Sequence, residues 1–104
     1  MTKEELLKNY CIDYLFFNYC IEEHLLQEKE NYTQDDVKKI SQLIDLKQVG
    51  FETKDILYYQ ALLKAEKKEE IVKILKNQRS KVLRKVHEEE KKMSILDYYI
   101  YKMR

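Results

Sequence analysis

The stretch Tyr32–Ile56, YTQDDVKKISQLIDLKQVGFETKDI, contains the signals that decide the fold. Thr33 can cap a helix whose inner face carries apolar residues at helical spacing, namely Val37, Ile40, Leu43, Ile44 and Leu46. Gly50, the only glycine in the chain, stands where a left-handed C-cap is expected. A further helix is predicted over roughly Lys54 to Leu63. The stretch therefore predicts two consecutive helices joined by a short turn.

Two more helices are predicted before this stretch. Thr2 and Glu5 have the spacing of a capping box, which predicts a short helix from Lys3 to about Asn9. After a break, Cys11–Leu26 (CIDYLFFNYCIEEHLL) carries apolar residues at helical spacing, namely Ile12, Leu15, Phe16 and Tyr19. The polar segment Gln27–Asn31, QEKEN, predicts a loop.

The chain after about Lys67 shows a different pattern. Apolar residues recur near heptad spacing among Lys, Arg and Glu, namely Ile71, Leu75, Val82, Val86, Met93 and Leu96. So small a monomer cannot cover such a stripe, so we expect this coiled-coil-like helix to pack against a partner, most simply a second copy of the chain. The end, Ser94–Arg104, is expected to form a final amphipathic turn or two that folds back onto the neighbouring chain.

The composition favours a mainly all-α protein. One glycine, no proline and 38% charged residues argue against a β-sandwich, because sheets need many turns. At 104 residues, with 44% hydrophobic residues, the chain can bury a modest core. The absence of a long apolar run and of a basic-then-apolar leader predicts a cytoplasmic protein with no membrane contact.

Charge is distributed unevenly along the chain. Residues 1–50 contain six basic and ten acidic residues, a net charge of −4, and the overall charge of +1 therefore leaves +5 for residues 51–104. An acidic first half disfavours tight phosphate binding by that half.

In the order and spacing of its residues, the chain resembles the MerR-type (mercury-resistance regulator) family of bacterial transcription factors. The family pattern L-R-x-L-G-F-S-L-E-E-I falls on Leu46, Lys47, Val49, Gly50, Phe51, Asp55 and Ile56. The pattern E-L-A-K-x-x-G-V-S-x-x-T-L-R-Y-Y-x-x-x-G-L-L falls on Glu5, Leu6, Leu7, Lys8, Ile12, Asp13, Tyr19, Leu25 and Leu26. The resemblance implies a winged-helix-like helix-turn-helix domain over residues 1–65, then a dimerisation helix and short tail over residues 66–104.

The resemblance also implies a homodimer that controls transcription by distorting duplex DNA between two half-sites. The second helix would be the recognition helix, and the candidate DNA-contacting residues are Lys8, Asp13, Tyr14, Asn18, Tyr19, Lys29 and Tyr32. The dimer would form by antiparallel pairing of Glu69 to about Lys92 as a coiled coil, and the candidate dimerisation residues are those of the heptad stripe.

Several positions depart from the family pattern. Leu15 and Asn18 occupy the places of the two recognition-helix arginines, and Cys11 and His24 occupy the places of two glycines. The wing is shortened to QEKEN. These departures support an alternative function, a protein–protein interaction module that acts as an antirepressor or as a heterodimer partner on a scaffold that no longer grips DNA.

Other potential sites are weaker. Cys20 and His24 lie four residues apart on one helix, but two ligands do not make a zinc site, so no metal or cofactor is expected. The basic run Lys76–Lys85, KNQRSKVLRK, is either a phosphate-binding strip or, more simply, the solvated face of a coiled coil. Tyr58, Tyr59, Tyr98, Tyr99 and Tyr101 can line a drug pocket or pack the dimer interface. No arrangement of residues suggests an enzyme.

Overall fold

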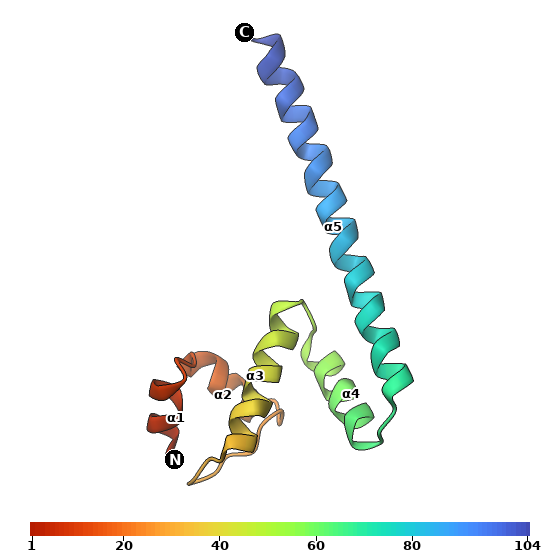
Figure 1. The fold of residues 1–104 in the computed structure, drawn as a ribbon. Coiled ribbons are helices and arrows are strands. Elements are labelled where there is room, and N and C mark those ends of the chain that lie inside the picture. The colour runs from red at the N-terminus through yellow and green to blue at the C-terminus, as the bar shows by residue number, and fades with distance from the viewer.

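The computed structural model describes all 104 residues and consists of five α-helices without any strand (Figure 1). The helices are α1 (Lys3–Asn9), α2 (Tyr14–Glu22), α3 (Gln34–Gln48), α4 (Thr53–Lys64) and α5 (Lys68–Lys102). The all-α prediction is confirmed. The segment between α2 and α3 is a loop, so no β-hairpin wing is present. None of the five helices combines the length with the apolar composition that crossing a bilayer requires.

The starts of α1, α2 and α3 are fixed by side chains that accept hydrogen bonds from unpaired backbone N–H groups. The Thr2 hydroxyl accepts from the Glu5 N–H, at 3.2 Å, and the Glu5 carboxylate accepts from the Thr2 N–H. Asp13 caps α2 by accepting from the Leu15 N–H at 2.9 Å. Thr33 forms the corresponding capping box with Asp36. The two threonine caps were predicted by the sequence and are confirmed.

The turns use left-handed backbone at three positions that bear on the scaffold. Gly50 has φ +96°, Cys11 has φ 51° and His24 has φ 60°. A side chain in this region is strained, which is why glycine is preferred there. Cys11 and His24 therefore adopt a backbone conformation that would suit glycine better, at the two positions where the predicted resemblance has glycine and this chain does not.

Gly50 provides a first test of the fold. Gly50→Ala is expected to lower the free energy of unfolding by about 1–2 kcal/mol, because a side chain at this φ is strained. A Cβ there would also lie 2.9 Å from Gln78 Nε2, which donates a hydrogen bond to the Val49 carbonyl at 2.7 Å. Urea unfolding measures the loss. Gln78→Ala removes both the close contact and the hydrogen bond to Val49, so it is the reference for the double variant. Gly50→Ala/Gln78→Ala should still be less stable than Gln78→Ala, and equal stabilities would contradict the backbone explanation.

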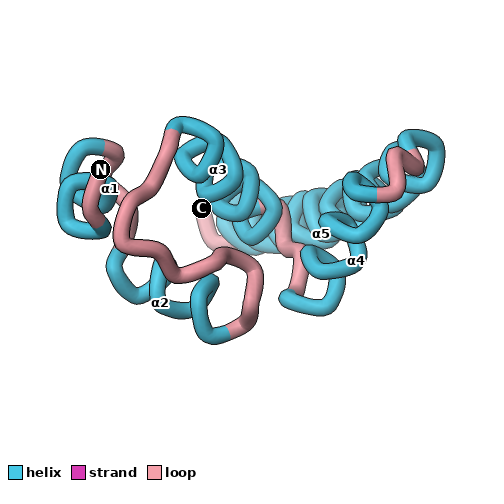
Figure 2. Tube along the Cα trace, turned by 90° about the horizontal axis from the view of Figure 1, so that it is seen from below, coloured by secondary structure: helices cyan, strands magenta, loops and turns pink.

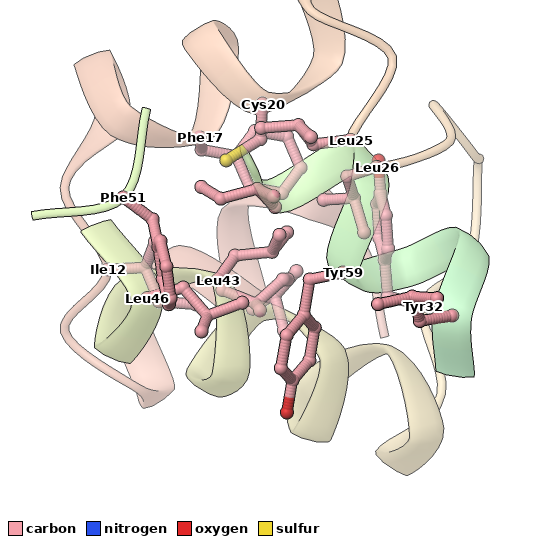
Figure 3. Close-up of a cluster of buried hydrophobic side chains, with 14 of the residues drawn as sticks. Ile12, Phe17, Cys20, Leu25, Leu26, Tyr32, Leu43, Leu46, Phe51 and Tyr59 are labelled. Atoms are coloured by element: carbon pink, nitrogen blue, oxygen red, sulfur yellow. The ribbon is translucent and has the colours of Figure 1, made fainter. Parts of the chain in front are cut away.

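One hydrophobic core joins all five helices. Side chains from α2, α3 and α4, among them Phe17, Leu43 and Tyr59, converge on a common interior (Figure 3). The 15 core residues are Leu6, Ile12, Phe17, Cys20, Leu25, Leu26, Tyr32, Ile40, Leu43, Leu46, Phe51, Ile56, Tyr59, Leu62 and Ile71. Their burial is the main favourable contribution to folding. The core ends at Ile71, which is the only buried residue of α5.

The loop between α2 and α3 is tied to the N-terminus. Met1 and Tyr32 exchange two hydrogen bonds: the Tyr32 N–H donates to the Met1 carbonyl at 2.7 Å, and the Met1 amino group donates to the Tyr32 carbonyl at 2.9 Å. In Figure 2 this loop runs back past α1 to the start of α3. The contact ties the loop between α2 and α3 to the residues that precede α1.

Helix α5 makes the molecule elongated. Only its first turns pack on α4, and the remainder projects away from the other helices (Figure 1). The radius of gyration is 19.1 Å, whereas a compact domain of this length would have about 13 Å. The structure differs from the sequence prediction at the end of the chain, because Ser94 to Lys102 continue α5 without a break instead of forming a separate turn. Neither proline nor glycine interrupts the segment.

Candidate functional site

The exposed face of α2 is apolar and aromatic at its start and acidic at its end. Leu15 is 75% exposed and Tyr14 is 58% exposed. Glu22 and Glu23 are also exposed, and the helix contains no basic residue. The face therefore offers apolar contact area without a positive charge of its own.

Lys3 is a basic side chain that contacts α2, and its ammonium group is engaged within the molecule. Its Nζ donates to Asn18 Oδ1 at 3.1 Å. The same ammonium lies 4.8 Å from the ring centroid of Tyr14 and 5.3 Å from that of Phe17. These contacts hold α1 against α2 by a charge-assisted hydrogen bond and cation–π attraction. They also occupy the carbonyl with which Asn18 would read a base.

Both the hydroxyl and the ring of Tyr19 have partners within the molecule. Its hydroxyl shares a hydrogen bond with the Thr53 hydroxyl at the start of α4. Lys47 Nζ lies 5.0 Å from the ring centroid. The residue therefore joins α2 to α3 and α4, and its only polar atom is already paired.

The loop residues predicted to contact DNA are also used internally. Lys29 Nζ forms a salt bridge with Asp36 Oδ1 at 2.8 Å. Tyr32 is only 2% exposed, and its hydroxyl accepts from the Lys29 N–H at 3.1 Å. Its ring packs edge-on against Phe17 with centroids 5.7 Å apart. Tyr32 is therefore a core residue, and its assignment to a DNA-contacting surface is corrected.

Asp36 is the only buried charged residue of the chain. The hydrogen bond from Lys29, together with hydrogen bonds from the Thr33 N–H and hydroxyl, lowers the pKa of this carboxyl below its ordinary value. Burial opposes the shift, but the hydrogen bonds outweigh it. The carboxylate thus stabilises the start of α3 and holds the loop in place.

A pH-dependent stability difference follows from Asp36. Because the folded pKa is lowered, the carboxylate stabilises the protein fully above its unfolded pKa of about 3.9, and this contribution is lost as the pH falls through the folded value. Asp36→Asn is therefore expected to have a lower free energy of unfolding than the parent at pH 7. This difference should become smaller at a pH below the unfolded pKa. Urea unfolding at both pH values measures it. Asp35→Asn, an exposed neighbour, should show no such narrowing; a gap for Asp36→Asn that does not change with pH would contradict the account.

The cysteines and His24 do not assemble a metal site. Burial raises the pKa of the Cys20 thiol to about 11, although nearby Lys47 lowers it slightly, so the sulfur stays protonated at neutral pH. No group of three or more His, Cys, Asp or Glu side chains is positioned to hold a metal ion. Cys20 packs in the core, and Cys11 is exposed. Both cysteines are free thiols.

A second surface is formed by α5. Exposed residues recur in alternating steps of three and four, and we name this set the α5 seam: Val72, Leu75, Arg79, Val82, Val86, Glu89, Met93, Leu96, Ile100 and Met103. Eight of the ten are apolar, with exposed fractions from 39% at Leu75 to 86% at Met103. Strict heptad alternation of this kind is the mark of a helix that packs along its length against another helix.

Ile71 does not belong to the α5 seam. It is 8% exposed and packs into the core, so its assignment to the dimerisation surface is corrected. The heptad register begins one residue later, at Val72. The sequence is sufficient to assign this register, because the unbroken alternation of steps of three and four residues starts at Val72 and not at Ile71. The remaining predicted dimerisation residues, Leu75, Val82, Val86, Met93 and Leu96, all lie on the α5 seam.

The basic run and the tyrosines are divided between different environments. Lys81, Arg84 and Lys85 line a depression together with Glu52, Asp55 and Glu88, so the positive charge there is balanced. Tyr59 is in the core, whereas the other candidate tyrosines are exposed, namely Tyr58, Tyr98, Tyr99 and Tyr101. They do not gather into one aromatic pocket.

No family model, curated protein or solved structure matches this chain.

Proposed function

We propose that this protein is a homodimeric interaction module on a helix-turn-helix scaffold, and that its α2 face binds a protein rather than duplex DNA. One observation carries the proposal. Of the seven residues that the resemblance to MerR-type regulators places at DNA, five are buried or engaged within the molecule, namely Asp13, Asn18, Tyr19, Lys29 and Tyr32.

Electrostatics supports the same conclusion. DNA affinity comes largely from neutralising phosphates, and each lost contact weakens binding steeply at physiological salt. Lys29 is paired with Asp36, and the Lys3 ammonium is held by Asn18 and two aromatic rings. Glu22 and Glu23 remain exposed on α2. The exposed Tyr14 and Leu15 are instead suited to a protein interface, where aromatic and aliphatic anchors supply most of the binding energy.

The residue pattern of the α5 seam supports a second copy of the chain as the partner of α5. If two copies pair antiparallel about an axis level with Arg84, residues equally far on either side of Arg84 face one another. Val82 then meets Val86 of the second copy, Leu75 meets Met93, and Val72 meets Leu96. The only two charged residues of the α5 seam are Arg79 and Glu89. Arg79 of each copy then faces Glu89 of the other copy, which gives two ion pairs.

Other arrangements are less favourable. A parallel pair in register would place Arg79 against Arg79 and Glu89 against Glu89, which is repulsive. Within one chain Glu89 forms a salt bridge with Lys92 at 2.9 Å, and both side chains are highly exposed. Such exposed pairs contribute little to stability, so Glu89 can exchange Lys92 for Arg79 of the second copy with little loss of free energy. The charge pattern of the α5 seam is thus complementary to itself only in the antiparallel register.

The test of this function is fluorescence anisotropy with a labelled DNA duplex at low salt, where non-specific binding is strongest. We expect no saturable binding by the purified dimer. The positive arm is a pull-down with the protein and its Tyr14→Ala/Leu15→Ala variant as matched baits. A partner retained by the parent and lost by the variant supports the proposal, and saturable duplex binding would overturn it.

A DNA-binding transcriptional regulator remains the second candidate, favoured by one observation. Helix α2 is exposed at its N-terminal end, as a groove-reading helix must be, and Tyr14 and Lys8 are both exposed there or on the preceding helix. This function requires duplex binding that Tyr14→Ala and Lys8→Ala weaken. The same anisotropy measurement therefore distinguishes the two candidates.

A further inference from the structure

A pocket between α3 and α4 has an unusual lining. Its volume is about 700 Å³, within the range of small-molecule sites. Its eight lining residues are His24, Lys38, Lys39, Gln42, Gln60, Ala61, Leu63 and Lys64, and none of them is acidic. They come from the turn that follows α2, the middle of α3 and the last turns of α4.

The positive charge in this pocket is not balanced. Lys38, Lys39 and Lys64 take part in none of the salt bridges of the molecule, which join Lys29 to Asp36, Lys54 to Glu52 and Lys92 to Glu89. Residues 1–50 carry a net charge of −4, yet the pocket gathers two of their six lysines without an acid. The depression beside α5 shows the ordinary case, in which three cations share the lining with three carboxylates.

The walls of the pocket are defined by the fold. Gln60 Nε2 donates to the Leu25 carbonyl at 3.2 Å, which fixes the α4 wall against the segment that follows α2. On α3, Gln42 follows Lys38 by four residues and Lys39 by three, so the three side chains share one edge of the helix. Ala61 and Leu63 provide the only apolar part of the lining.

We propose that this pocket binds a phosphorylated small molecule carrying two or more negative charges. Three lysines and a histidine suit a multiply charged anion better than a single carboxylate, because ammonium groups bind phosphate as separate point charges. The apolar residues and the volume allow an organic group beside the phosphates. This site goes beyond the proposed protein interaction and does not depend on it.

The experiment is a titration of the ¹⁵N-labelled full-length protein with sodium pyrophosphate and, separately, with ATP, followed by amide NMR shifts. We expect saturable changes confined to the neighbourhood of His24, Lys38 to Gln42 and Gln60 to Lys64. Lys38→Ala/Lys39→Ala should weaken binding at least about tenfold, whereas Lys38→Arg/Lys39→Arg should retain it.

The matched control is Lys73→Ala/Lys91→Ala, which removes the same charge from exposed positions of α5 that line no pocket. It should bind both probes like the parent. Shifts spread along α5, equal weakening in both alanine variants, or no saturation at millimolar probe would overturn the assignment. A DNA duplex that displaces pyrophosphate would also overturn it, whereas failure of pyrophosphate binding alone would leave the proposed protein interaction standing.

Discussion

Arg79→Glu is expected to dissociate the homodimer. In the antiparallel register Arg79 faces Glu89 of the second copy, and the twofold axis repeats this pair. The substitution replaces two attractions by two repulsions within a partly desolvated interface. We expect the dimer dissociation constant to rise by about 100-fold or more. Sedimentation velocity over a concentration series measures the change, and circular dichroism verifies that α5 remains helical.

Two further variants make this prediction specific. Arg79→Glu/Glu89→Arg restores opposite charges across the axis and should recover most of the lost affinity. Lys73→Glu makes the same change in charge within two turns of Arg79, but Lys73 is exposed on the face of α5 that points away from the α5 seam, so it should affect the dimer little. A double variant no better than Arg79→Glu alone would refute the register.

Leu15→Arg/Asn18→Arg is expected to confer saturable DNA binding, which we expect the parent protein not to show. These positions correspond to the recognition-helix arginines of the MerR-type pattern, and Leu15 is already 75% exposed. Four added arginines in a dimer can neutralise up to four phosphates, so log K should fall with log salt at a slope of about −3.6. Fluorescence anisotropy with a random-sequence duplex measures both the affinity and the slope.

Ser80→Arg/Ser94→Arg is the matched control for this gain of binding. It adds the same charge to exposed positions of α5 that are off the α5 seam. If binding depends on the α2 face, the control should bind much more weakly. Equal binding by the two variants would show that total charge alone is responsible, and would count against α2 as a former DNA-reading helix.

The helices were largely predictable from local signals. The Thr2 and Thr33 caps and the single glycine at position 50 mark helix ends through contacts within a few residues. The far end of α5 was less predictable. Ser94 begins an aromatic segment that looks like a separate tail, yet nothing in it stops a helix, so α5 continues to Lys102.

The contacts around α2 were not predictable, because they join segments far apart in the sequence. Tyr32 is an aromatic residue beside a polar loop, and its burial depends on packing against Phe17, which belongs to a different helix. The hydroxyl of Tyr19 is hydrogen-bonded to Thr53, which lies 34 residues away in the sequence. The pocket between α3 and α4 was missed for the same reason, since no stretch of sequence holds His24, Lys38 and Lys64 together.

In the proposed homodimer α5 pairs antiparallel about Arg84, and the distance between two spin labels distinguishes this pairing from a parallel one. A spin label on Ser94→Cys, in a Cys11→Ser background, is exposed and off the α5 seam, and Cys20 is buried with a raised pKa and should not react. Each label then lies ten residues from the axis, and the two labels lie on opposite sides of it. At 1.5 Å per residue, double electron–electron resonance should give about 30 Å between backbone positions, broadened by the label linkers. A distance near 10 Å, as parallel helices would give, or no intermolecular distance at all, would contradict the account.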